Sequence, residues 1–212
     1  MEKETHILPN GEVVEFFPET HQYFWNGKEL PSITQLISKR FGNSYDAVNP
    51  EILKSASEYG SIIHDQLSTI IDKKLAGIKE DIQTDYDEVY NYFCYVEPFY
   101  GIRPTMTEKV VLLYGADGTP AACGRFDLLA KLNGENALLD FKTTTNMHIL
   151  SVTNQLNLYL IAAKQSGYIK DISNFKLGAI NLVKNEWNFV PIAVLSPDFY
   201  LKFLEDVSNK EE

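Results

Sequence analysis

The first part of the chain alternates hydrophobic and polar residues with the period of two that is typical of strands. Residues 12–17 and 22–30 predict short strands, and Asn26-Gly27 predicts the type I′ turn of a hairpin within the second stretch. A helical period follows, with Ser32 as the N-cap of a short helix and Asn49 as the N-cap of a long one. We expect these two helices to run to about Arg40 and to Lys74, with Gly77 ending the second.

The rest of the pattern predicts a helix, three strands, a second helix, two strands and a last helix. The expected bounds, in that order, are 85–100, then 106–114, 121–132 and 137–143, then 149–165, then 175–183 and 187–194, then 196–207. The core order is therefore a long helix, three antiparallel strands, a helix and a strand. This order predicts an α/β fold with a mixed central sheet flanked by helices.

Composition narrows the class of protein. The 212 residues favour a single domain, and 19 basic against 29 acidic residues give a formal net charge of −10. That charge excludes a protein that coats nucleic acid by bulk attraction, although a small basic groove remains compatible with it. Between residues 80 and 97 there are six acidic residues and no basic one, which predicts a solvated acidic face.

Cysteine usage and the apolar runs exclude several further classes. Cys94 and Cys123 lie far apart, so a disulfide framework, a structural zinc site and a four-cysteine iron–sulfur site all lack ligands. The first residues contain no basic region followed by an apolar one, and the apolar runs are short. We therefore expect no signal peptide, no transmembrane helix and no membrane partner, and a cytoplasmic location.

Two strands joined by a tight turn bring chemically interesting side chains together. Asn133-Gly134 is a strong hairpin signal, and a two-residue turn there places Asp127 opposite Asp140. A four-residue loop would instead place Asp127 opposite Lys142. Because side chains alternate along a strand, either turn puts these three residues on one face, whereas a three-residue loop with a bulge would not.

Two carboxylates held together on a strand repel each other and lose hydration, unless a divalent cation neutralises them. Oxygen ligands with water completing the shell suit Mg²⁺ or Mn²⁺. A lysine beside such a site, here Lys142, could orient an attacking water or stabilise negative charge on phosphorus. The alternative interpretation is an ordinary Asp–Lys salt bridge on a solvent-facing strand.

Two helices carry further candidates at a spacing of one turn. Gly60 and His64 share a face of the long helix, where a glycine suggests close approach of another backbone and a histidine could bind the metal. Gln155 and Tyr159 share a face of the later helix. Taken alone, the histidine is equally compatible with a packing or surface role, and the Gln–Tyr pair with a partly buried polar seam.

The combined pattern resembles the RecB-like branch of the PD-(D/E)XK nucleases. This branch includes RecB-type nuclease domains, phage recombination exonucleases and the mitochondrial genome maintenance exonuclease. The matching motifs are Gly60-x-x-x-His64, Glu108, Gly124-Arg125-Phe126-Asp127, Asp140-Phe141-Lys142-Thr143-Thr144 and Gln155-x-x-x-Tyr159. The segment from His21 to Lys28, followed by Pro31-Ser32-Ile33-Thr34, is similar to the N-terminal part of phage-encoded members, so the resemblance spans about residues 20–195.

The resemblance implies a restriction-endonuclease-like core of the order αβββαβ at 49–195, an N-terminal hairpin and helical extension at 1–48, and a C-terminal helix at 196–212. It also implies a role for each matching residue. The metal ligands would be His64, Asp127, Asp140 and the backbone carbonyl of Phe141, with Lys142 positioning the water. Glu108 would have a second-metal or a supporting role, Gln155 and Tyr159 would organise the site and contact DNA, and Arg125, Thr143 and Thr144 would contact phosphates.

Two departures from the family pattern bear on this expectation. Phe126, not proline, precedes the first metal aspartate, as is common in this branch, and the missing cysteines remove the cluster-dependent subgroup, which includes the CRISPR-associated exonucleases. The resulting hypothesis is a bacterial or phage-encoded deoxyribonuclease that requires Mg²⁺ or Mn²⁺. It would act as an exonuclease on DNA ends or single strands in recombination or repair, with a recombination partner protein. The alternatives are an endonuclease and a non-catalytic acidic binding or inhibitor protein on the same fold.

Overall fold

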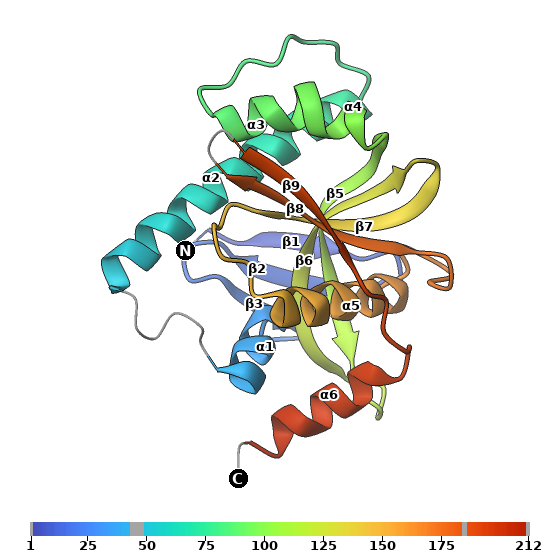
Figure 1. The fold of residues 1–212 in the computed structure, drawn as a ribbon. Coiled ribbons are helices and arrows are strands. Elements are labelled where there is room, and N and C mark those ends of the chain that lie inside the picture. Colours follow the sequence, from blue (N-terminus) through green and yellow to red (C-terminus); the bar gives the residue numbers. More distant parts are fainter. Residues whose placement is uncertain (1, 43–48, 184–185, 211–212) are drawn as a thin grey trace.

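The computed structural model describes residues 2–42, 49–183 and 186–210, so the domain boundary expected at residue 48 lies outside the described residues. The elements follow one another around two sheets (Figure 1). In chain order they are β1 (Glu4–Ile7), β2 (Val13–Phe17), β3 (Gln22–Trp25), β4 (Lys28–Leu30), α1 (Ile33–Phe41), α2 (Pro50–Leu75), α3 (Asp87–Asn91), the π-helical turn η1 (Tyr92–Val96), α4 (Glu97–Phe99), β5 (Ile102–Tyr114), β6 (Pro120–Leu132), β7 (Glu135–Lys142), α5 (Ile149–Gln165), β8 (Lys176–Val183), β9 (Glu186–Ile192) and α6 (Phe199–Ser208).

The larger sheet has five strands in the order β5-β6-β7-β8-β9. All neighbouring pairs are antiparallel except β7 and β8, which run parallel and are joined through α5. This mixed sheet with helices confirms the predicted α/β class. The turn at Asn133-Gly134 has two residues and pairs Leu132 with Glu135, which is the first of the two registers considered above.

Both faces of this sheet are covered, and alternate residues of each strand enter different cores. Leu138 packs on the face covered by α5, α1 and α6, whereas its neighbour Leu139 packs on the face covered by α2 and the α3–η1 segment (Figure 1). A strand buried on both sides is therefore hydrophobic almost throughout. A buried polar residue within it, such as Asp140, stands out against that background.

The smaller sheet is antiparallel, in the order β1-β2-β3-β4, and packs on the ends of β5 and β6 near Leu112 and Cys123. The predicted hairpin is present, with positive φ angles at Asn26 (49°) and Gly27 (76°) as a type I′ turn requires. Strand β1 was not predicted. It is an edge strand with no fully buried residue, so it leaves no hydrophobic alternation in the sequence.

The predicted helix starts are confirmed by their caps. The Ser32 hydroxyl accepts a hydrogen bond from the Gln35 amide at 3.0 Å, and the Gln35 side chain accepts one from the Ser32 amide at 2.7 Å, which completes a capping box. The Asn49 side chain accepts from the Glu51 amide at 2.9 Å. Such caps stabilise a helix by about 1 kcal/mol each. They fix where α1 and α2 begin, and both helices border the pocket described below.

The segment expected as one helix over 85–100 is divided into α3, η1 and α4, and the prediction of a solvated acidic face is wrong for two of its residues. Glu88 and Glu97 are buried, with 3% and 9% of their surface exposed. Glu97 forms an ion pair with Lys74 at the end of α2, at 2.6 Å. A basic residue from outside the segment thus provides the partner that the local sequence lacks.

Two other boundaries differ from prediction by three residues or more. β5 begins at Ile102, four residues before the expected start, because Ile102 pairs with Leu132 at the far end of β6. The last helix begins at Phe199 instead of Ser196, because the Ser196 carbonyl closes a turn with the Phe199 amide. Among the described residues, no helix combines the length and apolar character needed to cross a membrane.

Candidate active site

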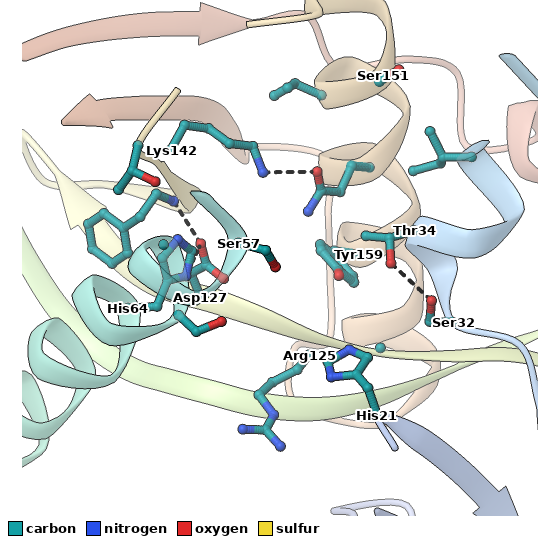
Figure 2. Close-up of a pocket in the computed structure, with 18 of the residues that line it drawn as sticks. His21, Ser32, Thr34, Ser57, His64, Arg125, Asp127, Lys142, Ser151 and Tyr159 are labelled. Carbon is teal, nitrogen blue, oxygen red and sulfur yellow. Dashed lines mark hydrogen bonds and ion pairs between the residues drawn. The ribbon is translucent and has the colours of Figure 1, made fainter. Parts of the chain in front are cut away.

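One pocket of about 860 Å³ opens between α1, α2 and α5, where the two sheets meet. Figure 2 shows His64 and Asp127 on one side of this space and Tyr159, Ser32 and Thr34 across from them. The expected site residues that line it are His64, Glu108, Arg125, Asp127, Phe141, Lys142, Thr143, Thr144, Gln155 and Tyr159. Asp140, the remaining expected residue, is 1% exposed and lies directly beside this lining.

Three side chains in the pocket form a group able to hold a cation. His64, Glu108 and Asp127 each offer one ligand atom, and these atoms lie within 4.8 Å of one another. Nδ1 of His64 is 3.4 Å from Oδ2 of Asp127. The resemblance implied Asp140 as a ligand and gave Glu108 a second-metal or a supporting role. Here Glu108 belongs to the assembled group, and Asp140 does not.

His64 reaches this group from α2, one turn after Gly60. A Cβ atom on Gly60 would lie 3.2 Å from the Thr143 hydroxyl, so the glycine does permit a close approach. The approaching group is a side chain, whereas the sequence suggested a backbone. The imidazole also packs edge-to-face on Phe141, with ring centroids 5.9 Å apart, which fixes the direction in which His64 points.

Glu108 sits in β5 with a left-handed backbone, at φ 50°. A residue other than glycine in this region is strained, and such strain often marks functional positions. The pairing of β5 with β6 is interrupted there, between Thr107↔Leu128 and Lys109↔Phe126, which leaves Glu108 across from Asp127. The irregular backbone therefore presents the Glu108 carboxylate to the same space as Asp127.

Asp127 marks the place where β6 and β7 part. Their pairing runs from the turn to Leu128↔Leu139 and stops one residue short of Asp127 and Asp140. Beyond it, Oδ2 of Asp127 accepts a hydrogen bond from the Phe141 amide at 2.7 Å. The side chain thus takes a backbone donor that a strand partner would otherwise use, and it holds the end of β7 against the pocket.

A second polar cluster joins β7 to α5. Nζ of Lys142 lies 2.7 Å from Oδ2 of Asp140, and it also donates to Oε1 of Gln155 at 3.2 Å. The amide nitrogen of Gln155 donates to Oδ1 of Asp140 at 3.1 Å. Gln155 therefore fixes both members of the ion pair, in which Asp140 is buried and Lys142, 23% exposed, lines the pocket.

Tyr159 forms the next turn of the same wall and is hydrogen-bonded to Gln155. Its ring packs against the backbone of Gly124 so closely that a Cβ there would come within 2.6 Å of Cε1. The glycine of the Gly-Arg-Phe-Asp motif thus has a packing explanation. The expected polar seam of Gln155 and Tyr159 is present, and it faces the pocket.

Arg125 connects the pocket to the small sheet. Its guanidinium carbon lies 4.7 Å from the centroid of the Phe16 ring, and its nitrogens are 3.5 Å from Glu4 and 3.8 Å from Glu108. The Nη2 atom is buried and makes no hydrogen bond with the described residues. Arg125 is therefore held by the Phe16 ring and by two carboxylates that balance its charge.

Burial and mutual charge perturb the acids and the histidine strongly. Burial lowers the pKa of His64, but the Asp127 carboxylate outweighs that effect and raises the pKa to about 9. Burial and the charge of Asp127 raise the pKa of Glu108 to about 8. Burial also raises the pKa of Asp140 to about 6, against the opposing effect of Lys142. Burial opposes ionisation of Asp127 too, yet the His64 charge keeps its pKa below the usual value.

The sequence analysis missed several residues that line the pocket. Ser57 and Ser61 on α2 are a turn apart and overlap the Gly60–His64 face, so helical spacing could have found them. His21 and Ser151 also line the pocket, as Figure 2 shows. His21 has a left-handed backbone at φ 53° in the loop between β2 and β3, and no local signal in the sequence connects it with the distant motifs.

Comparisons with known proteins add little to this geometry. No family model and no curated protein matches the chain. Among solved structures, the chain is similar to one described as "Crystal structure of SSO0001", with 14% sequence identity and a TM-score of 0.46. The match covers 85% of this chain and 76% of that chain. Identity and TM-score at these values assign no function.

Proposed function

We propose that this protein is a metal-dependent deoxyribonuclease with a RecB-like PD-(D/E)XK core. One observation carries the proposal: the His64–Glu108–Asp127 group and the Asp140–Lys142–Gln155 cluster border a single pocket. A cation-binding group beside a lysine held by a carboxylate is an arrangement that can support phosphodiester hydrolysis. The element order α2, β5, β6, β7, α5, β8 agrees with the αβββαβ order implied by the resemblance.

The residues present fit Mg²⁺ or Mn²⁺. His64, Glu108 and Asp127 combine an imidazole nitrogen with two carboxylate oxygens, and open pocket space beside them leaves room for water and a phosphate. When bound, the cation would polarise the scissile phosphate and lower the pKa of a coordinated water. Asp140 lies outside this group, and its Oδ2 is engaged by the Lys142 ammonium at 2.7 Å.

Lys142 is the residue best placed to act on the reacting water and on negative charge at phosphorus. Its ammonium is held from two sides by Asp140 and Gln155, which limits its motion and keeps it directed along the wall of the pocket. Gln155 in turn is fixed from the Tyr159 side. We therefore infer that Lys142 is catalytic, and that Gln155 and Tyr159 are positioning residues.

The test is digestion of end-labelled single- and double-stranded linear DNA, with closed circular DNA alongside, in Mg²⁺ or Mn²⁺. We expect cleavage of linear DNA that stops in EDTA and in Lys142→Ala. Lys176→Ala is the matched control, because Lys176 is exposed on β8 and lies outside the pocket. Full activity of Lys142→Ala would refute the assignment, and equal cleavage of closed circles would favour an endonuclease.

The alternative of an acidic inhibitor depended on the stretch from residue 80 to residue 97. Because Glu88 and Glu97 are buried there and Glu97 is paired with Lys74, the exposed charge of that segment is smaller than its sequence suggests. The nuclease proposal is therefore the one that the pocket supports best.

A further inference from the structure

The pocket that would receive the nucleic acid is not positively charged. Its two permanent cations each face carboxylates: Lys142 contacts Asp140, and Arg125 lies between Glu4 and Glu108. The acidic residues lining the pocket are Glu4, Asp65, Glu108 and Asp127. Because carboxylates face both cations, attraction by fixed positive charge alone cannot account for binding of a phosphate backbone.

The pocket is rich in neutral hydrogen-bond donors instead. Hydroxyl groups project from three helices and from the segment after β7. They belong to Ser32, Thr34 and Ser38 near α1, Ser57 and Ser61 on α2, Thr143 and Thr144 after β7, and Ser151 and Tyr159 on α5. Figure 2 shows Ser57, Thr34, Ser151 and Tyr159 around the same space as His64 and Asp127. These hydroxyls therefore stand on opposite walls of the pocket; that of Thr34 also lies 2.9 Å from the Ser32 hydroxyl, and that of Ser151 lies 2.6 Å from Nδ1 of His148.

Ser57 and Ser61 are the most telling of these residues. Serines within helices commonly donate to a carbonyl of the preceding turn, as Ser68 does to Asp65 at 3.0 Å. Ser57 and Ser61 donate no hydrogen bond to any described residue, although they lie on the same helix. They are exposed and line the pocket one turn apart, on the face that also carries Gly60 and His64.

The small side chains on this face leave room for a chain to lie along α2. Ala56, Ser57, Gly60 and Ser61 follow one another into the pocket, before His64 marks the cation-binding group. A sugar–phosphate chain has charged oxygens at regular intervals, and neutral hydroxyls can donate to them without displacing counterions. The wall thus suits a backbone that approaches the metal group along the helix.

We propose that the hydroxyl wall formed by Ser57, Ser61, Thr34 and Ser151 binds a single DNA strand through its sugar–phosphate backbone, with affinity that depends on the cation and only weakly on salt. This inference rests on the proposed function, because it places the substrate strand of that same site. It adds the binding residues and the physical means of binding, which is neutral hydrogen bonding where most nucleic-acid sites use lysine and arginine.

The experiment measures binding of a fluorescein-labelled oligothymidylate by anisotropy, with monovalent salt varied at fixed Mn²⁺. Asp140→Asn serves as the cleavage-impaired background, since Asp140 is not a member of the three-residue cation group. In that background, Ser57→Ala/Ser61→Ala is compared with Ser68→Ala, a serine of the same helix that lies outside the pocket and is bonded to its own helix. Thermal unfolding of each variant checks that it is folded.

We expect Ser57→Ala/Ser61→Ala to weaken binding by about tenfold or more and Ser68→Ala to leave it unchanged. The slope of log K against log salt should be small, from about −1.4 if Arg125 and Lys142 alone are engaged on a single strand to about −2.8 if bound Mn²⁺ also contacts it, and should be equal in all variants. A slope of about −4 or steeper, or unchanged affinity in the double variant, would overturn the inference.

These outcomes separate the two proposals. If Ser57→Ala/Ser61→Ala in an otherwise wild-type chain cleaves DNA normally and binds it with unchanged affinity, the role of the hydroxyl wall is refuted. The nuclease assignment is then unaffected. If the wild-type protein does not cleave DNA but the double variant still binds DNA more weakly than the wild type, the hydroxyl wall is supported and the nuclease assignment is refuted. Absence of any DNA binding in Mn²⁺ overturns both.

Discussion

Replacing Asp140 by asparagine should stabilise the metal-free protein near neutral pH. Asp140 is 1% exposed, and burial raises its pKa to about 6 even though Lys142 lies 2.7 Å away. An unperturbed aspartate titrates near 3.9, so ionising Asp140 in the folded state costs about 3 kcal/mol more than in the unfolded chain. Asparagine removes that cost and keeps the shape. Its amide cannot satisfy Gln155 and Lys142 equally well, so the expected net gain is about 1–2 kcal/mol.

The sign of the pH dependence follows from the raised pKa. Stability from protonated Asp140 is complete below about pH 4 and is lost as pH rises through about 6. Urea unfolding in EDTA should therefore show Asp140→Asn more stable than wild type at about pH 8, with most of the gain gone at about pH 4. Asp117→Asn is the control with the opposite sign, because hydrogen bonds from Thr119 lower the pKa of Asp117. A less stable Asp140→Asn at about pH 8 would refute the reasoning.

Three further results should follow from the same geometry. His64→Ala should weaken Mn²⁺ binding by about tenfold or more, as measured by titration calorimetry. Equal Mn²⁺ affinity of the variant and the wild type would contradict a role for the imidazole as a ligand. Burial and Asp127 raise the pKa of Glu108 to about 8, and Asp127 overcomes the effect of burial to raise the pKa of His64 to about 9. Metal binding at pH 7 should therefore release between one and two protons, and it should tighten as pH rises. Buffers of different ionisation enthalpy measure this release, and its absence would contradict the perturbed pKa values. Gly124→Ala should destabilise the fold by about 1–3 kcal/mol through its clash with Tyr159, and more than Gly60→Ala, whose Cβ meets only a threonine hydroxyl. Thermal unfolding compares the two, and the reverse order would contradict the packing argument.

Much of the fold could be predicted because its signals are local. Asn133-Gly134 and Asn26-Gly27 specify hairpin turns through their backbone preferences, and each produced the expected two-residue turn. Ser32 and Asn49 specify helix starts through their own hydrogen bonds. The mixed sheet then followed from the order of the elements, since a helix between two strands implies a parallel pairing.

The details of the site could not be predicted, because they depend on contacts between distant residues. Strand parity places Asp127 and Asp140 together, but it does not reveal that the ladder stops at Leu128↔Leu139 and that Asp127 binds the Phe141 amide. The sequence gives no signal for a left-handed backbone at a glutamate, and the resemblance leaves the role of Glu108 open between binding a second metal and supporting the site. Its place beside His64 and Asp127 depends on the local interruption of pairing between β5 and β6.

The net charge of −10 does not describe the charge inside the candidate active site. Burial raises the pKa of Glu108 to about 8 and that of Asp140 to about 6, so at pH 7 the pocket carries less negative charge than its carboxylates suggest. In the proposed nuclease, burial also removes competing water, so deprotonated Glu108 and Asp127 would bind a divalent ion strongly. On the proposed function, the cation therefore both completes the fold and creates the attraction for DNA, and a cation at a hundred times its Kd would add about 2.7 kcal/mol to stability. In this proposal, one bound cation and a row of hydroxyls bind DNA locally. A chain of net negative charge could then act on nucleic acid without a basic surface.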